Sequence, residues 1–192
     1  MTQKNIFYQD YLTQFLTNKG DPYTHTRIGN KEMGINGGSF QINTSENQNF
    51  IEKYKEYVFK KGKMEYITEK QIIENGPLLV DIDLRYNPDI QERQHSPEHI
   101  VDLIMLYANK IASILNIPNK TRIPVFIMEK NEVNILDDKT KDGIHIIFGI
   151  SMHKAIQLLL REKVLKDLVD MWDDLPFTNN IEDVIDLGIV KG

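Results

Sequence analysis

Two aspartates separated by one residue, Asp81 and Asp83, have the spacing in this sequence that first suggests chemistry. They lie in the apolar run 77–86, which predicts a buried strand. Residues i and i+2 of a strand point to the same face, so the two carboxylates project together and repel each other. A hard divalent cation such as Mg²⁺ or Mn²⁺ would neutralise them through its preferred oxygen ligands. The alternative is a strand end at which both carboxylates are solvated.

The composition of the 192-residue chain excludes several other kinds of site. It contains no cysteine, which excludes disulfides, cysteine nucleophiles and thiolate metal centres and fits a reducing compartment. No run approaches the roughly 18 apolar residues that span a bilayer, and residues 1–4 do not begin a signal peptide, so we expect no membrane segment. The net charge of −5 argues against a dedicated nucleic-acid clamp, and a metal-binding carboxylate cluster would contribute to it.

Residues 1–75 predict a smaller N-terminal α/β lobe built from a helix, a strand and a helix. Apolar residues recur at helical spacing over 5–18, and again after a short strand expected at 39–42. His25 and Arg27 lie between the first helix and this strand, in what reads as a polar loop. The lysines beside and after the second helix fit a solvated helix face, and phosphate-backbone contact is the functional alternative.

Residues 76–192 predict an α+β unit in which strands and helices alternate. Ser96 as N-cap and Pro97 as the first helical residue mark the start of one helix, and a polar turn at 137–143 precedes a strand. The order β-α-β-β-α-β is that of the ferredoxin-like or RRM-like folds, in which both helices cover one face of the sheet. The expected elements are a strand at 78–84, a helix at 97–115, strands at 123–128 and 144–148, a helix at 152–172 and a strand at 184–190.

In this fold the first strand lies between the third strand and the last. The two-residue period of each strand then places one set of side chains against the helices and the other set on an open face. On the last strand, Ile185 and Leu187 are expected to pack, which leaves Asp186 on the open face. The residues expected together on the open face are Asp81, Asp83, Gly143, His145 and Asp186.

Three carboxylates and a histidine on one sheet face suggest phosphate chemistry with metal ions. Two oxygen-ligated cations can activate an attacking hydroxyl and stabilise the leaving oxygen of an in-line displacement. His145 could ligate a metal, donate to a phosphate or be an ordinary surface histidine. Lys141 and Gly143 favour the phosphate role, because one adds positive charge and the other lets a ligand approach the backbone closely.

The order of these motifs resembles that of the archaeo-eukaryotic primases, the primase–polymerase superfamily. That family has an Asp-x-Asp on the first strand, a histidine motif on the third and a single Asp on the last. The flanking residues are similar to the N-terminal primase domain of the poxvirus-type primase–helicases of nucleocytoplasmic large DNA viruses, from about residue 20 to the end of the chain. The stretches that carry the resemblance are residues 24–29, 37–40, 65–71, 80–86 and 141–145.

The resemblance implies a DNA primase or polymerase, a nucleotidyltransferase that uses NTPs or dNTPs on a single-stranded DNA template and releases pyrophosphate. It also implies an intracellular role in viral DNA replication, in the host cytoplasm or nucleus, and a superfamily-3 helicase in the same polypeptide. The residues that would hold the catalytic Mg²⁺ or Mn²⁺ are Asp81, Asp83 and Asp186. Those that would contact the nucleotide are His145, Lys141, Gly143 and Arg27.

Two features depart from the family's pattern. The second motif is often Ser-x-His, and Gly143 stands at the serine position, so a hydroxyl is lost that a backbone amide could replace. The chain also ends six residues after Asp186, where the family continues with an aromatic and basic segment. We therefore expect a truncated catalytic unit that could be inactive as a fragment. The chain contains no Walker A motif, so no helicase activity is assigned to it.

Two other functions stay open. A metal-dependent nuclease would use the same carboxylates with water as nucleophile and histidine as base, and it would need no NTP. A non-catalytic RRM-like module would bind nucleic acid through the same face, but it should expose aromatic residues on its first and third strands. In this sequence those positions hold acidic residues and His145.

Overall fold

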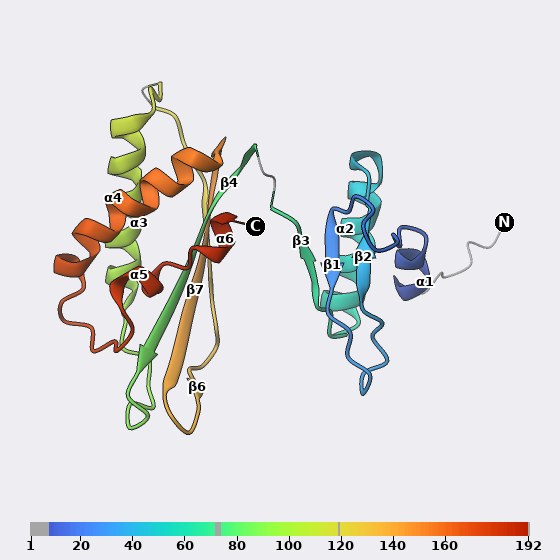
Figure 1. Cartoon of the computed structure of the whole chain (residues 1–192), viewed down its shortest axis with the longest axis horizontal. Helices are drawn as coiled ribbons and strands as arrows, with labels where there is room; N and C mark the ends of the chain where they lie inside the picture. Colours follow the sequence, from blue (N-terminus) through green and yellow to red (C-terminus); the bar gives the residue numbers. More distant parts are fainter. Residues whose placement is uncertain (1–7, 72–73, 119, 192) are drawn as a thin grey trace. The chain divides into compact units, whose positions relative to one another are not determined.

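The computed structural model describes residues 8–71, 74–118 and 120–191 (Figure 1). The chain divides into two units, residues 1–70 and 71–192, and the boundary expected from the sequence, after residue 75, lies a few residues further along. No helix in the described part of the chain is long and apolar enough to cross a membrane.

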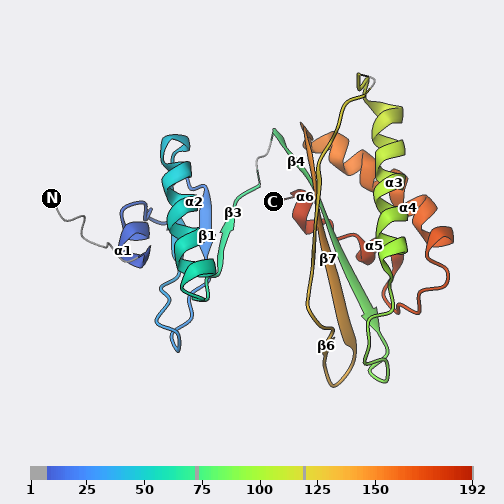
Figure 2. The same cartoon turned by 180° about the vertical axis from the view of Figure 1, so that it is seen from behind.

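The first unit builds an aromatic-rich core between its helices and a three-stranded antiparallel sheet of order β2-β1-β3. Figure 2 shows α2 lying along this sheet. The elements are α1 (Tyr8–Thr13), β1 (His25–Arg27), β2 (Gly38–Phe40), a 3₁₀ turn (Thr44–Glu46), α2 (Asn47–Lys55), a π-helical turn (Glu56–Lys60) and β3 (Ile67–Glu69). The buried core residues are Tyr8, Tyr11, Leu12, Phe40, Ile42 and Phe50.

The expected polar loop around His25 and Arg27 is wrong, because these residues form the central strand β1. Both side chains are buried, at 7 % and 6 % exposure. Burial of the Arg27 charge is possible because Glu65 pairs with it, and buried charges require such partners. A three-residue strand is too short for its periodicity to stand out in the sequence.

The first helix is shorter than the expected range 5–18, of which residues 5–7 lie outside the described part. It ends at Thr13, because the chain beyond it bonds to the sheet edge. The Thr17 amide donates to the Ser39 carbonyl at 2.9 Å, a contact that a continuing helix could not make.

The second unit is α+β, as expected, with an antiparallel sheet of order β4-β7-β5 and β6 also paired to β7. Figures 1 and 2 show α3 and α4 together on one side of this sheet. Both helices lie within two residues of their predicted bounds. The elements are β4 (Asn75–Tyr86), α3 (Pro97–Ile114), β5 (Val125–Glu129), β6 (Asn134–Ile135), β7 (Thr140–His153), α4 (Lys154–Met171), α5 (Ile181–Val184) and α6 (Gly188–Lys191).

Strand β4 has the predicted alternation of buried and partly exposed residues. Asp81 and Asp83 are only half-buried, on the face away from the helices. A fully buried aliphatic side chain contributes about 1.5–3 kcal/mol, so a one-residue slip that buried the two aspartates instead would be strongly disfavoured. The residues buried on the helix side are Leu78, Val80, Ile82, Leu84 and Tyr86.

Strand β7 is longer than the expected range 144–148, and the predicted polar turn at 137–143 is partly wrong. The strand begins at Thr140 and pairs with β4 from there to His153, with one irregularity at Gly149 and Ile150. Polar residues can lie in it because Asp142, which has no exposed surface, is bonded by the Arg93 guanidinium. The candidate residues in this region therefore lie on a strand and not in a turn.

The strand expected at 184–190 is also wrong. This segment consists of the end of α5, a single antiparallel bridge between Ile185 and Ile82, and α6. The Asp186 carboxylate accepts a hydrogen bond from the Gly188 amide at 2.8 Å, a local turn that ends the extended backbone.

Asn179 does part of the hydrogen bonding that a longer edge strand would do. Its side-chain amide donates to the Asp83 carbonyl at 2.8 Å, and its side-chain oxygen accepts from the Arg85 amide at 3.1 Å. The neighbouring Thr178 amide donates to the Arg85 carbonyl at 2.7 Å. These bonds satisfy backbone groups on the open edge of β4.

Replacing Asn179 with alanine is expected to lower the free energy of unfolding by about 1–3 kcal/mol, because two backbone groups of β4 lose their partner. Urea denaturation followed by circular dichroism measures this loss. Asn180→Ala is the matched control, because Asn180 is exposed and its side chain makes no capping hydrogen bond to α5. Equal stability of the two variants would show that Asn179 does not secure this edge.

Candidate functional site

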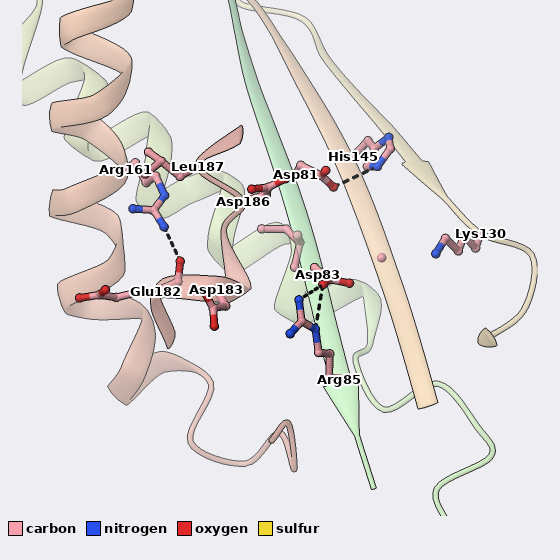
Figure 3. Close-up of a pocket in the computed structure, with 12 residues that line it drawn as sticks. Asp81, Asp83, Arg85, Lys130, His145, Arg161, Glu182, Asp183, Asp186 and Leu187 are labelled. Atoms are coloured by element: carbon pink, nitrogen blue, oxygen red, sulfur yellow. Dashed lines mark hydrogen bonds and ion pairs between the residues drawn. The ribbon is translucent and has the colours of Figure 1, made fainter. Parts of the chain in front are cut away.

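A charged cavity of about 440 Å³ lies on the open face of the second unit's sheet (Figure 3). It brings together five of the predicted residues: both aspartates of β4, the glycine and histidine of β7, and the single aspartate near the C-terminus. The lining residues are Asp81, Ile82, Asp83, Arg85, Lys130, Gly143, His145, Arg161, Glu182, Asp183, Asp186 and Leu187.

The Asp81 carboxylate and the His145 ring are in contact between the paired strands β4 and β7. They are directly opposed in the β4–β7 register, and the His145 Nε2 atom lies 3.0 Å from the Asp81 Oδ1 atom. The His145 side chain remains 58 % exposed, so its ring borders the cavity and stays accessible to a ligand. Residues that oppose each other on antiparallel strands share a face of the sheet, so the register alone places Asp81 and His145 together.

The environment of Asp81 disfavours its charge. Burial raises the pKa of Asp81 above the ordinary aspartate value, and the carboxylates of Asp186 and Asp83 push it in the same direction. The charges of His145 and Lys130 oppose this rise without reversing it. A cation placed among these carboxylates would relieve the repulsion.

Asp83 is neutralised by a residue of its own strand. The Arg85 Nε and Nη2 atoms donate to the same carboxylate oxygen at 3.0 and 2.8 Å. Arg85 lies two residues further along β4 and therefore on the same face. This i, i+2 spacing was visible in the sequence, and the sequence analysis did not assign Arg85 to the site.

Asp186 reaches the cavity from the turn between α5 and α6, not from a strand. Its amide donates to the Asp81 carbonyl at 2.8 Å, and Figure 3 shows the two carboxylates on neighbouring segments. The expectation that Leu187 packs against the helices is wrong, because this residue lines the cavity. The two-residue alternation stops where the backbone turns.

Lys141 and Arg27, the remaining predicted nucleotide contacts, do not line the cavity. Lys141 pairs with Arg85 in the register and so shares the open face. Arg27 belongs to the first unit, where its guanidinium is buried, lies 3.5 Å from the Glu65 carboxylate and donates to the Asn36 carbonyl at 2.5 Å. Nucleotide contact by these two residues stays a prediction.

The backbone amide of Gly143, at the position where the family often has serine, already has a hydrogen-bond partner. It donates to the Asp142 Oδ1 atom at 2.9 Å and is already satisfied. A Cβ atom at Gly143 would lie 3.3 Å from the Ile82 carbonyl oxygen, so a side chain there would be crowded. Any hydrogen-bond donor at this point of the cavity must come from another residue.

The carboxylate oxygens of the cavity fit a hard divalent cation in their chemistry. In the described part of the chain, however, no three His, Asp or Glu side chains are placed to surround one ion. Asp81 is turned to His145 and Asp83 to Arg85. A cation would therefore compete with these partners for the carboxylates.

Other cavity residues carry no signal in the sequence. Arg161 of α4 donates to the Ile185 carbonyl at 2.9 Å and also bonds the Glu182 carbonyl, which secures the C-terminal segment beside β4. Lys130 follows the end of β5. Both residues reach the cavity only through tertiary packing, which periodicity does not predict.

Comparison with known proteins finds a matching family and a viral relative. The family described as the C962R protein N-terminal AEP domain, where AEP denotes archaeo-eukaryotic primase, matches residues 29–192. The protein "Putative helicase L207/L206" of Acanthamoeba polyphaga mimivirus is 25% identical over 156 residues. This alignment covers 80% of the chain and 16% of the mimivirus protein, so the chain spans about a sixth of that relative.

Replacing Asp81 with asparagine is expected to stabilise the chain at pH 7. Folding raises the pKa of Asp81, so the ionised carboxylate lowers the free energy of unfolding at pH values above this raised pKa. The loss disappears at low pH, where Asp81 is protonated in both the folded and the unfolded state. The gain should be at most about 2 kcal/mol, the range of single stabilising substitutions, and should fade on acidification. Loss of the exposed ion pair with His145 offsets little of it.

Urea unfolding of Asp81→Asn at neutral and acidic pH measures this gain. Asp83→Asn is the control, because it removes the negative charge that pairs with the Arg85 guanidinium and should give no gain. A loss of stability in Asp81→Asn at pH 7 would contradict the repulsion assigned to Asp81.

Proposed function

We propose a function for this chain, which belongs to the family of C962R-type N-terminal archaeo-eukaryotic primase domains. The proposed function is metal-dependent, template-directed nucleotidyl transfer in viral DNA replication. The observation that carries the proposal is the gathering of Asp81, Asp83, Asp186 and His145 around one cavity. The substrates would be NTPs or dNTPs and a single-stranded DNA template. Neighbouring carboxylates beside an accessible histidine suit charge-neutralising phosphoryl chemistry.

The strand order supports an RRM-like assignment of the second unit. The order β4-β7-β5 places the third strand of the predicted unit beside the first, as expected, and α3 and α4 lie on one side of the sheet. The bridge between Ile185 and Ile82 lies at the edge where the last strand was expected. We infer that the unit is an RRM-like sheet whose last strand is reduced to this bridge.

Asp81, Asp83 and Asp186 would hold Mg²⁺ or Mn²⁺, which when bound would activate the attacking hydroxyl and neutralise phosphate oxygens. Arg85 pairs with the Asp83 carboxylate, so a cation held there would share that carboxylate with the guanidinium. His145, exposed beside Asp81, would turn a ring N–H to a phosphate oxygen. Proton binding by Asp81 would compete with the cation, because its pKa is raised by burial.

The partners and setting of the chain follow from its family and its relative. We infer that the domain acts at the site of viral replication in the host cell, ahead of a helicase in the same polypeptide. The mimivirus relative is named a putative helicase, which supports the presence of a helicase region in the same polypeptide. The alignment with this chain covers 16% of that relative.

Binding of nucleic acid by the sheet face is a second candidate function, and one observation favours it. Phe126 and Met128 of β5 are 58 % and 47 % exposed. Met128 is opposed to His145 and Phe126 to Ile147, so both lie on the open face beside the cavity. An exposed aromatic ring there can stack on a base. No observation favours a nuclease over the transferase.

Calorimetric titration with dATP, with and without Mn²⁺, tests the nucleotide site. The wild-type chain should bind dATP only with Mn²⁺, and His145→Ala and Asp186→Ala should each lose this binding because they remove cavity groups. Asp170→Ala, an exposed acidic position on α4 outside the cavity, is the matched control and should bind normally. Mn²⁺ binding without any effect on dATP would shift the assignment toward a nuclease.

Asp81→Ala and Asp83→Ala are each expected to abolish nucleotidyl transfer without unfolding the chain, because half-buried carboxylates on an open face contribute little to the core. Primer extension with a longer chain that includes the helicase region measures transfer, and circular dichroism measures folding. Full activity in either variant would refute the metal assignment. Degradation of single-stranded DNA without added nucleotide would identify a nuclease.

A further inference from the structure

Lys130 lies over the backbone of Gly143, in space that a side chain would otherwise occupy. A Cβ atom at Gly143 would be 3.8 Å from both the Cε and the Nζ atoms of Lys130. Figure 3 shows Lys130 across β7 from Asp83 and Arg85, with its ammonium directed toward the strand. These distances are ordinary van der Waals contacts, so the Lys130 ammonium lies directly beside the Gly143 backbone at the edge of the cavity.

The Lys130 ammonium differs from the other cationic groups of the cavity. Arg85 is bonded to Asp83, His145 to Asp81, and Arg161 to backbone carbonyls. For Lys130 the described residues provide neither a side-chain ion pair nor a side-chain hydrogen bond. An ammonium without a protein partner keeps its donors for an anionic ligand, and lysine is a common phosphate ligand in proteins.

The ion pair between the partly exposed Arg93 and the buried Asp142 positions the backbone on both sides of this contact. The Arg93 Nη2 atom donates to the Lys130 carbonyl at 2.6 Å, and the same guanidinium bonds both Asp142 oxygens at 2.9 and 3.1 Å. Asp142 also accepts the Gly143 amide at 2.9 Å. One fully buried carboxylate thus couples the backbone at Lys130 to the backbone at Gly143.

Two further residues enclose this pair. The His95 Nε2 atom lies 2.8 Å from the Glu129 carboxylate, which also lies 3.4 Å from Arg93. The His95 side chain is only 1 % exposed. Asp142 is the fully buried charge of this group, and removing its partner Arg93 would be costly because the carboxylate would be left uncompensated.

We propose that Lys130 binds the phosphate oxygens of the incoming nucleotide over Gly143, and that the Arg93–Asp142 pair is the positioning element for this contact. The proposal deepens the proposed function and rests on it. Lys130 supplies the donor that the Gly143 amide cannot supply, because that amide is bonded to Asp142. Asp81, Asp83 and Asp186 would hold the cation of the proposed function, and Lys130 would add positive charge on the opposite side of β7.

The test compares the affinities of dATP and dAMP in the presence of Mn²⁺. Lys130→Ala should weaken dATP binding by about 10- to 100-fold, the effect of one hydrogen bond to a charged group. It should change dAMP binding much less and leave Mn²⁺ binding unchanged. Lys130→Arg should restore part of the dATP affinity. Lys166→Ala, an exposed lysine of α4 outside the cavity, is the matched control and should bind as wild type.

Arg93→Gln tests the positioning role. It should weaken dATP binding without changing Mn²⁺ binding, and in combination with Lys130→Ala it should add little further loss, because both act on one contact. Thermal unfolding checks that the variant folds, and Arg93→Lys keeps the charge if the glutamine variant does not fold. Additive losses in the double variant would refute the positioning role.

The outcomes separate this proposal from the function on which it rests. Normal dATP binding by Lys130→Ala, beside lost binding by Asp81→Ala, would overturn the role of Lys130 and leave the nucleotidyltransferase standing. Equal loss of dATP and dAMP affinity would show that Lys130 does not act on the additional phosphates. A wild-type chain that binds no dATP with Mn²⁺ would overturn the proposed function, and the role of Lys130 with it.

Discussion

The antiparallel pairing of β4 with β7 is the constraint on which the rest of the second unit depends. It places Asp81 opposite His145 and Asp83 opposite Gly143, so two separate motifs meet on one face. The register is held by the buried aliphatic residues of the other face, which pack against α3 and α4. A slip of one residue would turn the carboxylates into the core and the apolar side chains to the cavity. Packing on one face therefore maintains the chemistry on the other.

The site balances negative charge against a small number of cations. Asp83 is paired with Arg85 and Asp81 with His145, and the latter carboxylate still has a pKa raised by burial. Such an arrangement costs stability in the absence of a ligand, which is typical of residues kept for function. On the helix side of the sheet, the buried Asp142 carboxylate is bonded by the Arg93 guanidinium and the Gly143 amide. It acts on the site through the position of the Gly143 backbone.

The edge of β4 shows how a sheet can be completed without a full strand. The Asn179 side chain bonds two backbone groups of β4, and the Asp186 amide bonds a third. Asp186 could then lie in a turn closed by its own carboxylate and the Gly188 amide. Asp186 lies on the face expected from strand alternation, but a turn and not a strand directs it there.

The sequence by itself determined the features that depend on local periodicity and residue order: helices α3 and α4, the alternation of β4, the shared face of Asp81 and Asp83, and the family. Only the tertiary structure decided the start of β7, the strand at His25, and the contact of Lys130 with Gly143. These features depend on partners far apart in the chain. Arg93 and Asp142 are separated by 49 positions, and Asn179 and Asp83 by 96. Periodicity reports which face a residue occupies, whereas a hydrogen bond between distant segments exists only after the chain has folded.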